Sequence, residues 1–137
     1  MRIRLDHIGI AVNELDSGSK FWEILGLKNS GEEVNVEQGV NIRFFDTDAG
    51  DNATRIELLS PTGEDTPIGK FLDKRGPGVQ QIAFQVDDLQ GLLNRLTNEG
   101  VRLINETPTI GAHGSKIAFV HPSSTGGVLV ELLEYSE

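Results

Sequence analysis

Four polar side chains occupy equivalent positions in a sequence that repeats itself. Residues 6–27 align without a gap with residues 80–101 at an offset of 74, and the same offset recurs later in each half. A fixed offset of this kind is the signature of a duplicated structural unit. The alignment pairs four polar residues, His7 with Gln81 and Glu57 with Glu131. If the two units pair about a pseudo-twofold axis, these side chains meet at a common centre.

The four residues carry donor groups that suit a divalent metal ion. One imidazole nitrogen, one amide and two carboxylates form a set that octahedral Mn²⁺, Co²⁺, Ni²⁺ or Mg²⁺ accepts, with one or two water positions left open. Glu57 and Glu131 each lie between aliphatic residues, so on a strand each carboxylate faces away from its apolar neighbours. The alternative for each Glu is a rim or solvent-facing residue, and for His7 alone a hydrogen-bonded core histidine.

The residue pattern predicts a strand, a helix and three more strands in the first half. His7–Val12 alternates Ile and Val as a strand does. The helix that follows is predicted to end at Gly26, since glycine is common just past a helix C-terminus. Its capping candidates are Asn13, Asp16 and Ser17. The other predicted strands are Glu33–Glu37, Val40–Asp46, which follows a Gln38-Gly39 turn, and Thr54–Leu59.

The second half repeats this order. A strand at Val79–Val86 precedes a helix at Asp88–Glu99, which we expect to be capped by Asp87 and stopped by Gly100. The remaining predicted strands are Val101–Ile104, Lys116–His121 and Val128–Leu133. Both halves therefore read as βαβββ modules. A short linker helix is predicted between them at about 67–75, with Pro67 in its first turn.

Length and composition restrict the possible functions. The chain has 137 residues, 12 basic and 21 acidic side chains, a formal net charge of −9 and no cysteine. The charge argues against nucleic acid and anionic membrane surfaces as partners. Without cysteine there is no disulfide, thiolate metal site or cysteine nucleophile. We find no targeting segment and no apolar run long enough to cross a bilayer, so we expect a cytoplasmic protein.

Several longer segments resemble a known family. They are LDHIGIAV at 5–12, EQGV at 37–40, IELLSPTGEDTPIGKFLDKRG at 56–76, VQQIAFQVDDL at 79–89 and IAFVHPSSTGGVLVELLE at 117–134. They resemble the vicinal-oxygen-chelate superfamily, which includes glyoxalases, bleomycin resistance proteins and dioxygenases, and within it the methylmalonyl-CoA epimerases. The resemblance implies an α+β fold in which two tandem βαβββ modules form a cupped mixed sheet around one central metal, usually in a homodimer.

The resemblance also implies how the chain is divided. We expect one glyoxalase-like domain over residues 1–137. Module one would cover about 1–62, the linker helix about 63–78 and module two about 79–137. Each module is too small to bury much surface alone, so we expect them to fold together.

Carried over residue by residue, the resemblance makes His7, Glu57 and Glu131 ligands of a divalent metal ion (Co, Mn, Ni, Mg or Zn). The family generally has a second ligand histidine where this chain has Gln81. A glutamine carbonyl coordinates such metals, but a neutral amide is a weaker donor than imidazole. Three outcomes are open: weaker metal binding, a different metal, or loss of the reaction.

The implied reaction interconverts the 2R and 2S forms of methylmalonyl-CoA. It removes the proton α to the thioester and returns it on the other face, through an enolate that a metal would stabilise. Such a reaction uses a base on each side of the α-carbon. By resemblance, Glu37 is one base and Glu131, also a ligand, is the other. The alternative for Glu37 is a solvated charge beside a turn, with Glu32 and Glu33 as nearby competitors.

The acyl-CoA substrate also needs contacts for its distant end. The candidates are Lys116, Ser124 and Thr125. The hydroxyls of Ser124 and Thr125 are equally typical of a turn between two strands, and Lys116 of a solvated surface charge.

Two other functions remain open for the sequence. One is a glyoxalase I-type lyase (lactoylglutathione lyase), which uses similar ligands and an enediolate. The epimerase-like linker and the STGGVLVEL segment argue against it. The other is a catalytically lapsed module that binds a small molecule without metal, which Gln81 favours.

Overall fold

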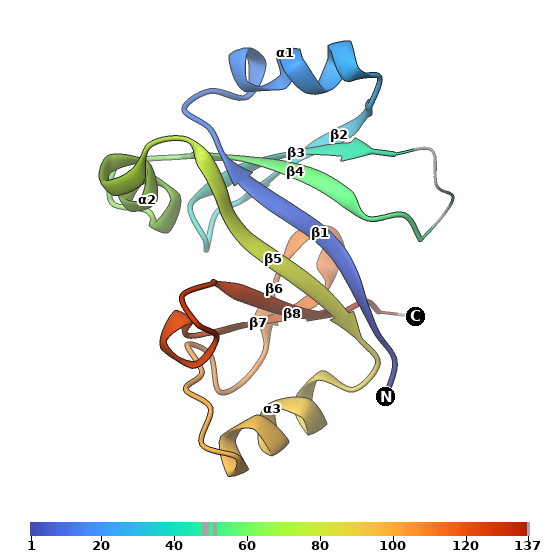
Figure 1. Cartoon of the computed structure of the whole chain (residues 1–137), viewed down its shortest axis with the longest axis vertical. Helices are drawn as coiled ribbons and strands as arrows, with labels where there is room; N and C mark the ends of the chain where they lie inside the picture. Colours follow the sequence, from blue (N-terminus) through green and yellow to red (C-terminus); the bar gives the residue numbers. More distant parts are fainter. Residues whose placement is uncertain (48–49, 51, 137) are drawn as a thin grey trace. The chain divides into compact units, whose positions relative to one another are not determined.

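The structure is a computed structural model that describes residues 1–47, 50 and 52–136. Its backbone contacts divide the chain into two compact units (Figure 1). The first unit is His7–Gln80, and the second combines Met1–Asp6 with Gln81–Glu137. Two strands, β1 (Ile3–Ala11) and β5 (Gly78–Val86), run through the boundaries between the units.

The first unit is a four-stranded mixed sheet with strand order β2-β3-β4-β1. Its strands besides β1 are β2 (Lys28–Asn35), β3 (Val40–Asp46) and β4 (Arg55–Pro61). β1 runs parallel to β4, whereas β2 with β3 and β3 with β4 are antiparallel. The predicted strand at Glu33–Glu37 therefore begins earlier and ends at Asn35. β2 is an edge strand with few apolar residues, which is why alternation did not reveal its start.

Helix α1 (Leu15–Leu25) packs on one face of this sheet. Val12, Phe45 and Leu58 form the buried centre of that layer, and Trp22 packs against them from the helix. Gly26 ends the helix with φ 111°, as predicted. The predicted cap is wrong: Glu14 is the N-cap and no side chain caps the helix.

Helix α2 (Pro67–Arg75) follows β4 and forms as the sequence predicts. Thr66 is its N-cap, with Oγ1 accepting a hydrogen bond from the Gly69 amide at 3.1 Å. Pro67 occupies the first turn, where a missing N–H costs nothing.

The second unit is also a mixed four-stranded sheet, with strand order β5-β8-β7-β6. β8 (Val130–Glu134) runs parallel to β5 and antiparallel to β7 (Lys116–Val120), and β6 (Thr109–Ile110) is a short edge strand. The strand predicted at Val101–Ile104 is absent from the described elements: Leu103 makes an isolated bridge to Val120. Short 3-10 turns at Ala112–Gly114 and Pro122–Ser124 flank β7.

Helix α3 (Leu89–Asn98) covers one face of the second sheet. Leu89 and Leu93 are 1% exposed and pack against Ala118, Val120 and Leu132. The predicted cap is corrected here: Asp88, not Asp87, is the N-cap, and its Oδ1 accepts a hydrogen bond of 3.1 Å from the Gly91 amide. The remaining face of this sheet carries Ala83, Ile117 and Leu133.

The first six residues are tied to the second unit by polar contacts. The Arg4 Nε donates to Gln85 Oε1 at 2.7 Å, and the Arg2 amide lies 3.3 Å from Asp87 Oδ2. This segment therefore belongs with the second unit even though it begins the chain.

The predicted α+β class is confirmed, with strands and a helix in βαβββ order in both halves. The duplication extends to strand register. Gly9 pairs with Glu57 between β1 and β4, and Ala83 pairs with Glu131 between β5 and β8. Both members of the second pair lie 74 residues after those of the first.

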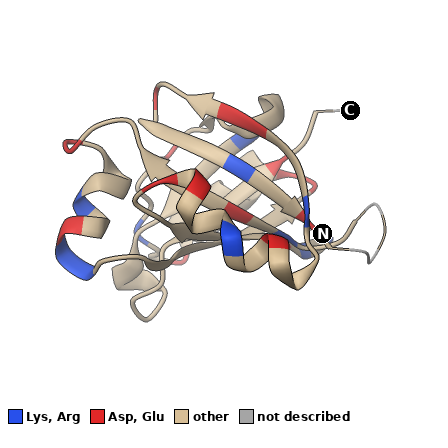
Figure 2. Ribbon diagram, turned by 90° about the horizontal axis from the view of Figure 1, so that it is seen from above, with Lys and Arg blue, Asp and Glu red and all other residues tan. Residues whose placement is uncertain are grey.

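Acidic and basic residues are interspersed along the described ribbon (Figure 2). No described helix combines the length and apolar character that crossing a membrane requires.

Candidate functional site

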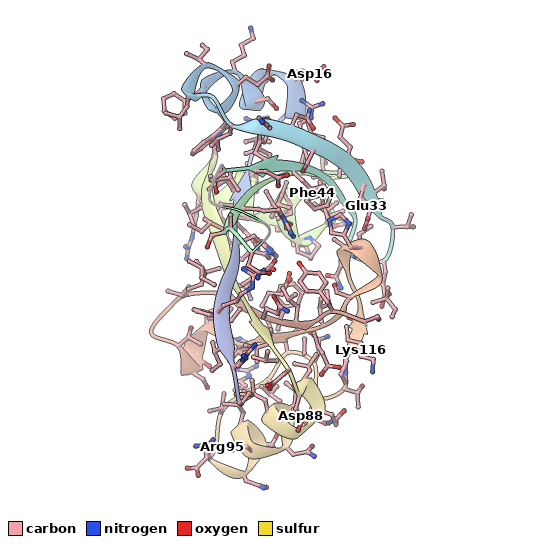
Figure 3. The ribbon with its side chains drawn as sticks, turned by 90° about the vertical axis from the view of Figure 1, so that its right-hand side faces the viewer. Asp16, Glu33, Phe44, Asp88, Arg95 and Lys116 are labelled. Carbon is pink, nitrogen blue, oxygen red and sulfur yellow. The ribbon has the colours of Figure 1, made fainter. Side chains whose placement is uncertain are left out.

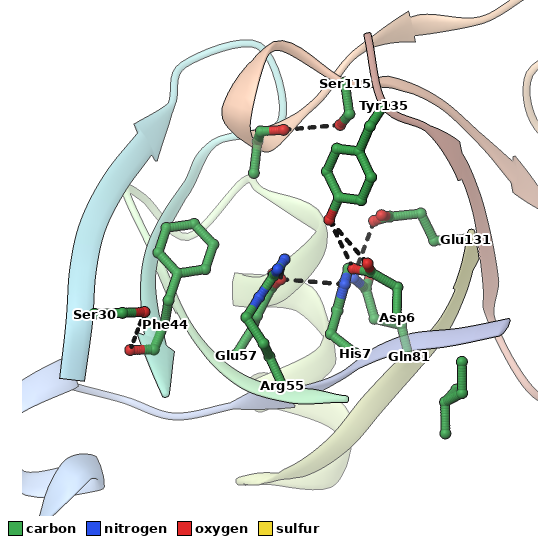
Figure 4. A network of polar contacts seen from close by, with 12 residues as sticks. Asp6, His7, Ser30, Phe44, Arg55, Glu57, Gln81, Ser115, Glu131 and Tyr135 are labelled. Carbon is green, nitrogen blue, oxygen red and sulfur yellow. Dashed lines mark hydrogen bonds and ion pairs between the residues drawn. The ribbon is translucent and has the colours of Figure 1, made fainter. Parts of the chain in front are cut away.

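In the first unit, His7 and Glu57 form a buried pair. His7 Nδ1 lies 3.1 Å from Glu57 Oε2, and the two side chains are 4% and 3% exposed (Figure 4). β4 explains the position of Glu57, because successive side chains on a strand face opposite sides. Leu58 packs toward α1, so Glu57 lies on the face away from that helix. Phe44 on β3 is its cross-strand neighbour.

Arg55 joins this pair and was not predicted from the sequence. Its Nη2 lies 3.1 Å from Glu57 Oε2, the same oxygen that His7 contacts. Its guanidinium lies over the Phe44 ring, with 5.7 Å from Cζ to the ring centroid. The repeat could not reveal Arg55, because its equivalent in the second half is Leu129.

In the second unit, Gln81 and Glu131 form the equivalent pair. Gln81 Nε2 donates a hydrogen bond of 3.1 Å to Glu131 Oε1, and the residues are 7% and 8% exposed (Figure 4). Phe119 on β7 is the cross-strand neighbour of Glu131, as Phe44 is of Glu57. Each unit therefore holds one nitrogen-bearing side chain against one carboxylate, beside an aromatic ring.

The donor atoms of the first unit have the spacing of two ligands on one metal ion. Two ligands at right angles on an ion, each about 2.1 Å from it, lie about 3.0 Å apart. The His7–Glu57 distance of 3.1 Å matches that spacing. For Gln81 the contacting atom is the amide nitrogen, whereas the carbonyl oxygen is the atom that binds metals. Coordination by Gln81 would therefore require its amide to turn away from this hydrogen bond.

The second unit also contains a buried carboxylate that sequence reasoning missed. Asp6 is 0% exposed, and its two oxygens lie 2.9 and 3.0 Å from the Tyr135 hydroxyl. Arg4 Nη2 lies 3.1 Å from Asp6 Oδ1. Burial of a charge requires such partners, so these contacts stabilise the carboxylate. Asp6 precedes His7 in the DH pair at 6–7, but nothing in its spacing distinguished it.

The candidate base Glu37 is exposed and lies in the turn between β2 and β3. Gly39 shapes that turn with φ 67°, and a Cβ there would lie 2.5 Å from Thr66 Cγ2. The turn is thus held against the start of α2. No described hydrogen bond joins Glu37 to His7 or Glu57, so its role stays a prediction.

Glu32, one competitor of Glu37, is engaged elsewhere. It accepts a 2.6 Å hydrogen bond from Arg43 Nε on the α1 side of the sheet. Arg43 also donates to Asp16 and Ser19, each at 2.9 Å. Burial alone would lower the pKa of Arg43, but the hydrogen bonds and charges of Asp16 and Glu32 outweigh it and raise that pKa. Arg43 therefore stays protonated, and the cluster ties α1 to β2 and β3.

The predicted substrate contacts lie in two different places. Ser124 Oγ accepts from the Arg102 amide at 2.8 Å, and Thr125 Oγ1 contacts the carbonyl and amide of Val128. Both hydroxyls thus stabilise backbone around the loop before β8. Lys116 pairs with Glu134 across β7 and β8, whereas Phe119 pairs with Glu131. Because alternate residues face opposite sides, Lys116 lies on the α3 side, away from Glu131.

Lys116 borders a cavity of about 440 Å³ in the second unit. Lys116 and Asp88, both labelled in Figure 3, line it together with Thr109 and Glu134. Glu134 Oε1 accepts a 2.8 Å hydrogen bond from the Leu89 amide at the start of α3. This cavity is therefore separate from the Gln81–Glu131 pair.

Comparison with known proteins shows which family the chain matches. The model of the Glyoxalase/Bleomycin resistance protein/Dioxygenase superfamily matches residues 6–119. The mitochondrial methylmalonyl-CoA epimerase of Dictyostelium discoideum is 41% identical over 133 residues, covering 96% of this chain and 78% of that protein.

Solved structures agree with this match. The structure of methylmalonyl-CoA epimerase from Mycobacterium tuberculosis is 43% identical with a TM-score of 0.91, covering 97% of this chain and 88% of that one. A methylmalonyl-CoA epimerase in complex with methylmalonyl-CoA and NH4+ is 39% identical with a TM-score of 0.91, covering 99% and 96%.

Proposed function

The chain belongs to the Glyoxalase/Bleomycin resistance protein/Dioxygenase superfamily, and we propose that it is an epimerase that interconverts the 2R and 2S forms of methylmalonyl-CoA. The observation that carries the proposal is the repeated buried pair, His7 with Glu57 and Gln81 with Glu131. Relatives 36–41% identical over nearly the whole chain are methylmalonyl-CoA epimerases, which are enzymes. This supports the same chemistry here.

The two pairs would together hold one divalent metal ion. His7, Glu57, Gln81 and Glu131 would supply one imidazole, two carboxylates and one amide oxygen, a set suited to Mn²⁺, Co²⁺, Ni²⁺ or Mg²⁺ more than to softer ions. When bound, such an ion would withdraw negative charge from the thioester oxygen and lower the barrier to proton removal.

Glu131 and Glu37 would move the proton. A carboxylate removes the proton from the α-carbon, and the electron pair of the C–H bond spreads into the thioester as an enolate. A second carboxylic acid then returns a proton to the opposite face. Glu37, on its turn held by Gly39, would act from the other side.

The remaining parts of the proposal concern the CoA end and the assembly. Lys116, Ser124 and Thr125 stay candidate contacts for acyl-CoA. Ser124 and Thr125 already bind nearby backbone, so they would act mainly by shaping their loop. Lys116 faces α3, so only a substrate tail passing the edge of the sheet would reach it. A homodimer, expected from the family resemblance, and a cytoplasmic location, expected from the sequence, remain predictions.

One observation favours a second candidate function. The Gln81 amide nitrogen, rather than its oxygen, contacts Glu131. That arrangement satisfies the carboxylate without a metal, as a small-molecule-binding module that has lost catalysis would do. A lyase of the glyoxalase I type is less well supported, because the relative at 41% identity is an epimerase.

Deuterium exchange separates these functions. The purified protein is stripped of metal, reloaded with Mn²⁺ or Co²⁺, and incubated with methylmalonyl-CoA in deuterated water. An epimerase incorporates deuterium at the α-carbon with metal and far less without it. Tight binding of methylmalonyl-CoA with no exchange under any metal would identify a binding module instead.

A further inference from the structure

A charge imbalance follows from the proposed ligand set. Glu57 and Glu131 carry two negative charges, which a divalent ion cancels. The substrate adds the free carboxylate of its methylmalonyl group, which is anionic at neutral pH. Ligands, ion and substrate carboxylate together then carry one net negative charge, so a positive group beside the ligands would favour binding of this anion.

Arg55 supplies a positive charge at that position. It lies on the same face of β4 as Glu57, because the two residues are two positions apart on one strand. Its Nη2 lies 3.1 Å from Glu57 Oε2, and its side chain is 20% exposed. The guanidinium is thus close to the ligand pair and partly shielded from water.

The guanidinium of Arg55 lies over an aromatic ring beside the ligand pair. Its Cζ is 5.7 Å from the centroid of the Phe44 ring, and Phe44 itself is 2% exposed. A guanidinium carries its N–H groups in a planar fork that matches the two oxygens of a carboxylate. The duplicated half offers no counterpart, since Leu129 occupies the equivalent position.

We propose that Arg55 binds the free carboxylate of the substrate and thereby selects malonyl-type thioesters over simple acyl thioesters. This inference rests on the proposed function, because the substrate class comes from it. Without substrate, the guanidinium of Arg55 pairs with Glu57. When substrate is present, the guanidinium binds its carboxylate. If the Arg55–Glu57 ion pair were purely structural, substitution of Arg55 would weaken the binding of all thioesters equally.

Binding of two thioesters tests this role. Methylmalonyl-CoA carries the carboxylate and propionyl-CoA lacks it. Their dissociation constants are measured by calorimetry with Mn²⁺ present, for the wild type, Arg55→Leu and Arg55→Lys. We expect Arg55→Leu to weaken methylmalonyl-CoA binding roughly 10- to 100-fold, the scale of a lost charged hydrogen bond, and to change propionyl-CoA binding by less than about 2-fold. Arg55→Lys should recover part of the loss.

A second readout is the affinity for Mn²⁺ without substrate. Arg55→Leu removes a positive charge beside Glu57, so its Mn²⁺ affinity should be higher than that of the wild type. If Arg55 only supported the structure of the site, the Mn²⁺ affinity of this variant would fall. Arg43→Leu is the matched control, because Arg43 lies on the α1 side of the same sheet, away from Glu57. It should leave the ratio of the two thioester affinities unchanged.

The following results would overturn the proposed role of Arg55 or the proposed function. Equal weakening of both thioesters in Arg55→Leu, or no preference for methylmalonyl-CoA in the wild type, would overturn the role of Arg55. If Arg55→Leu does not fold, Arg55→Lys carries the comparison, and an unchanged preference there counts against the role. A wild type that prefers methylmalonyl-CoA but shows no deuterium exchange would refute the epimerase proposal while leaving Arg55 as the carboxylate-binding residue.

Discussion

Gln81 Nε2 donates a hydrogen bond of 3.1 Å to Glu131 Oε1, at the position where the first half of the chain places His7 Nδ1 3.1 Å from Glu57 Oε2. The two contacts join residues that are equivalent by the repeat. Their strands share the same register, since Gly9 pairs with Glu57 and Ala83 with Glu131. One fold element has therefore been used twice, with an amide replacing an imidazole in the second copy.

Gln81→His should tighten metal binding. An imidazole nitrogen is a better donor to these ions than an amide, and coordination would no longer require the amide to turn from Glu131. We expect the dissociation constant for Mn²⁺ or Co²⁺ to fall at least roughly 10-fold relative to the wild type. Substitutions around metal ligands change metal affinity on this scale. Titration of the stripped protein with the metal measures this.

Gln80→His is the control for that experiment. Gln80 is the preceding residue on β5, so its side chain faces the other side of the strand. Equal tightening in both variants, or none in Gln81→His, would mean that residue 81 is not a metal ligand.

Glu131→Gln should abolish exchange while the fold survives. The amide is nearly the same size as the carboxylate but cannot remove a proton. Loss of a general base typically lowers the rate at least about 100-fold. The measurement is deuterium incorporation, with circular dichroism to check folding.

Glu134→Gln provides the matched change on the same strand. Glu134 lies on the α3 side, where its Oε1 accepts from the Leu89 amide, and a glutamine oxygen there accepts equally well. This variant should exchange at the wild-type rate. Near-normal exchange in Glu131→Gln would show that the base has been assigned wrongly.

Glu37→Gln should affect the two stereoisomers differently. If one base acts on each face of the α-carbon, removal of one base blocks deprotonation of one isomer only. We expect exchange from one pure isomer to fall at least about 100-fold and exchange from the other to persist. Mass spectrometry of each isomer in deuterated water gives both rates.

Glu33→Gln is the comparison for Glu37, because Glu33 lies on neighbouring β2. If the isomer-specific loss appears in Glu33→Gln and not in Glu37→Gln, the second base is Glu33.

Asp88→Ala should lower the free energy of unfolding by about 1 kcal/mol, the usual cost of removing an N-cap side chain. Its carboxylate accepts from the Gly91 amide at the start of α3. Asp87→Ala should stay within about 0.5 kcal/mol of the wild type, because Asp87 makes only an exposed contact at 3.3 Å. Urea unfolding of both variants checks this, and the reverse order would restore Asp87 as the cap.

The sequence was informative wherever the repeat or a motif carried the signal. The superfamily and the α+β class were predicted and are confirmed. The pairs at His7 and Gln81 were found because the repeat places polar residues at equivalent positions in its two copies. Gly26 was recognised as a helix stop because a glycine after an apolar helix has few other uses.

Features without a repeat partner were missed. Arg55 reads as an ordinary polar residue at a strand start, and only the fold places it against Glu57 and Phe44. Asp6 and Tyr135 are separated by 129 residues, so only the tertiary structure reveals their contact. The cap of α3 was assigned one residue early because Asp87 and Asp88 are adjacent and both can cap a helix; only the hydrogen bond to Gly91 separates them.

The most direct test of the account starts from one pure stereoisomer of methylmalonyl-CoA. The metal-loaded protein is added in deuterated water, and the two isomers are followed with time. We predict conversion toward an equal mixture, with deuterium entering the α-carbon and with strong dependence on the metal. A sample that keeps its original configuration and its α-proton with every metal offered would contradict the account.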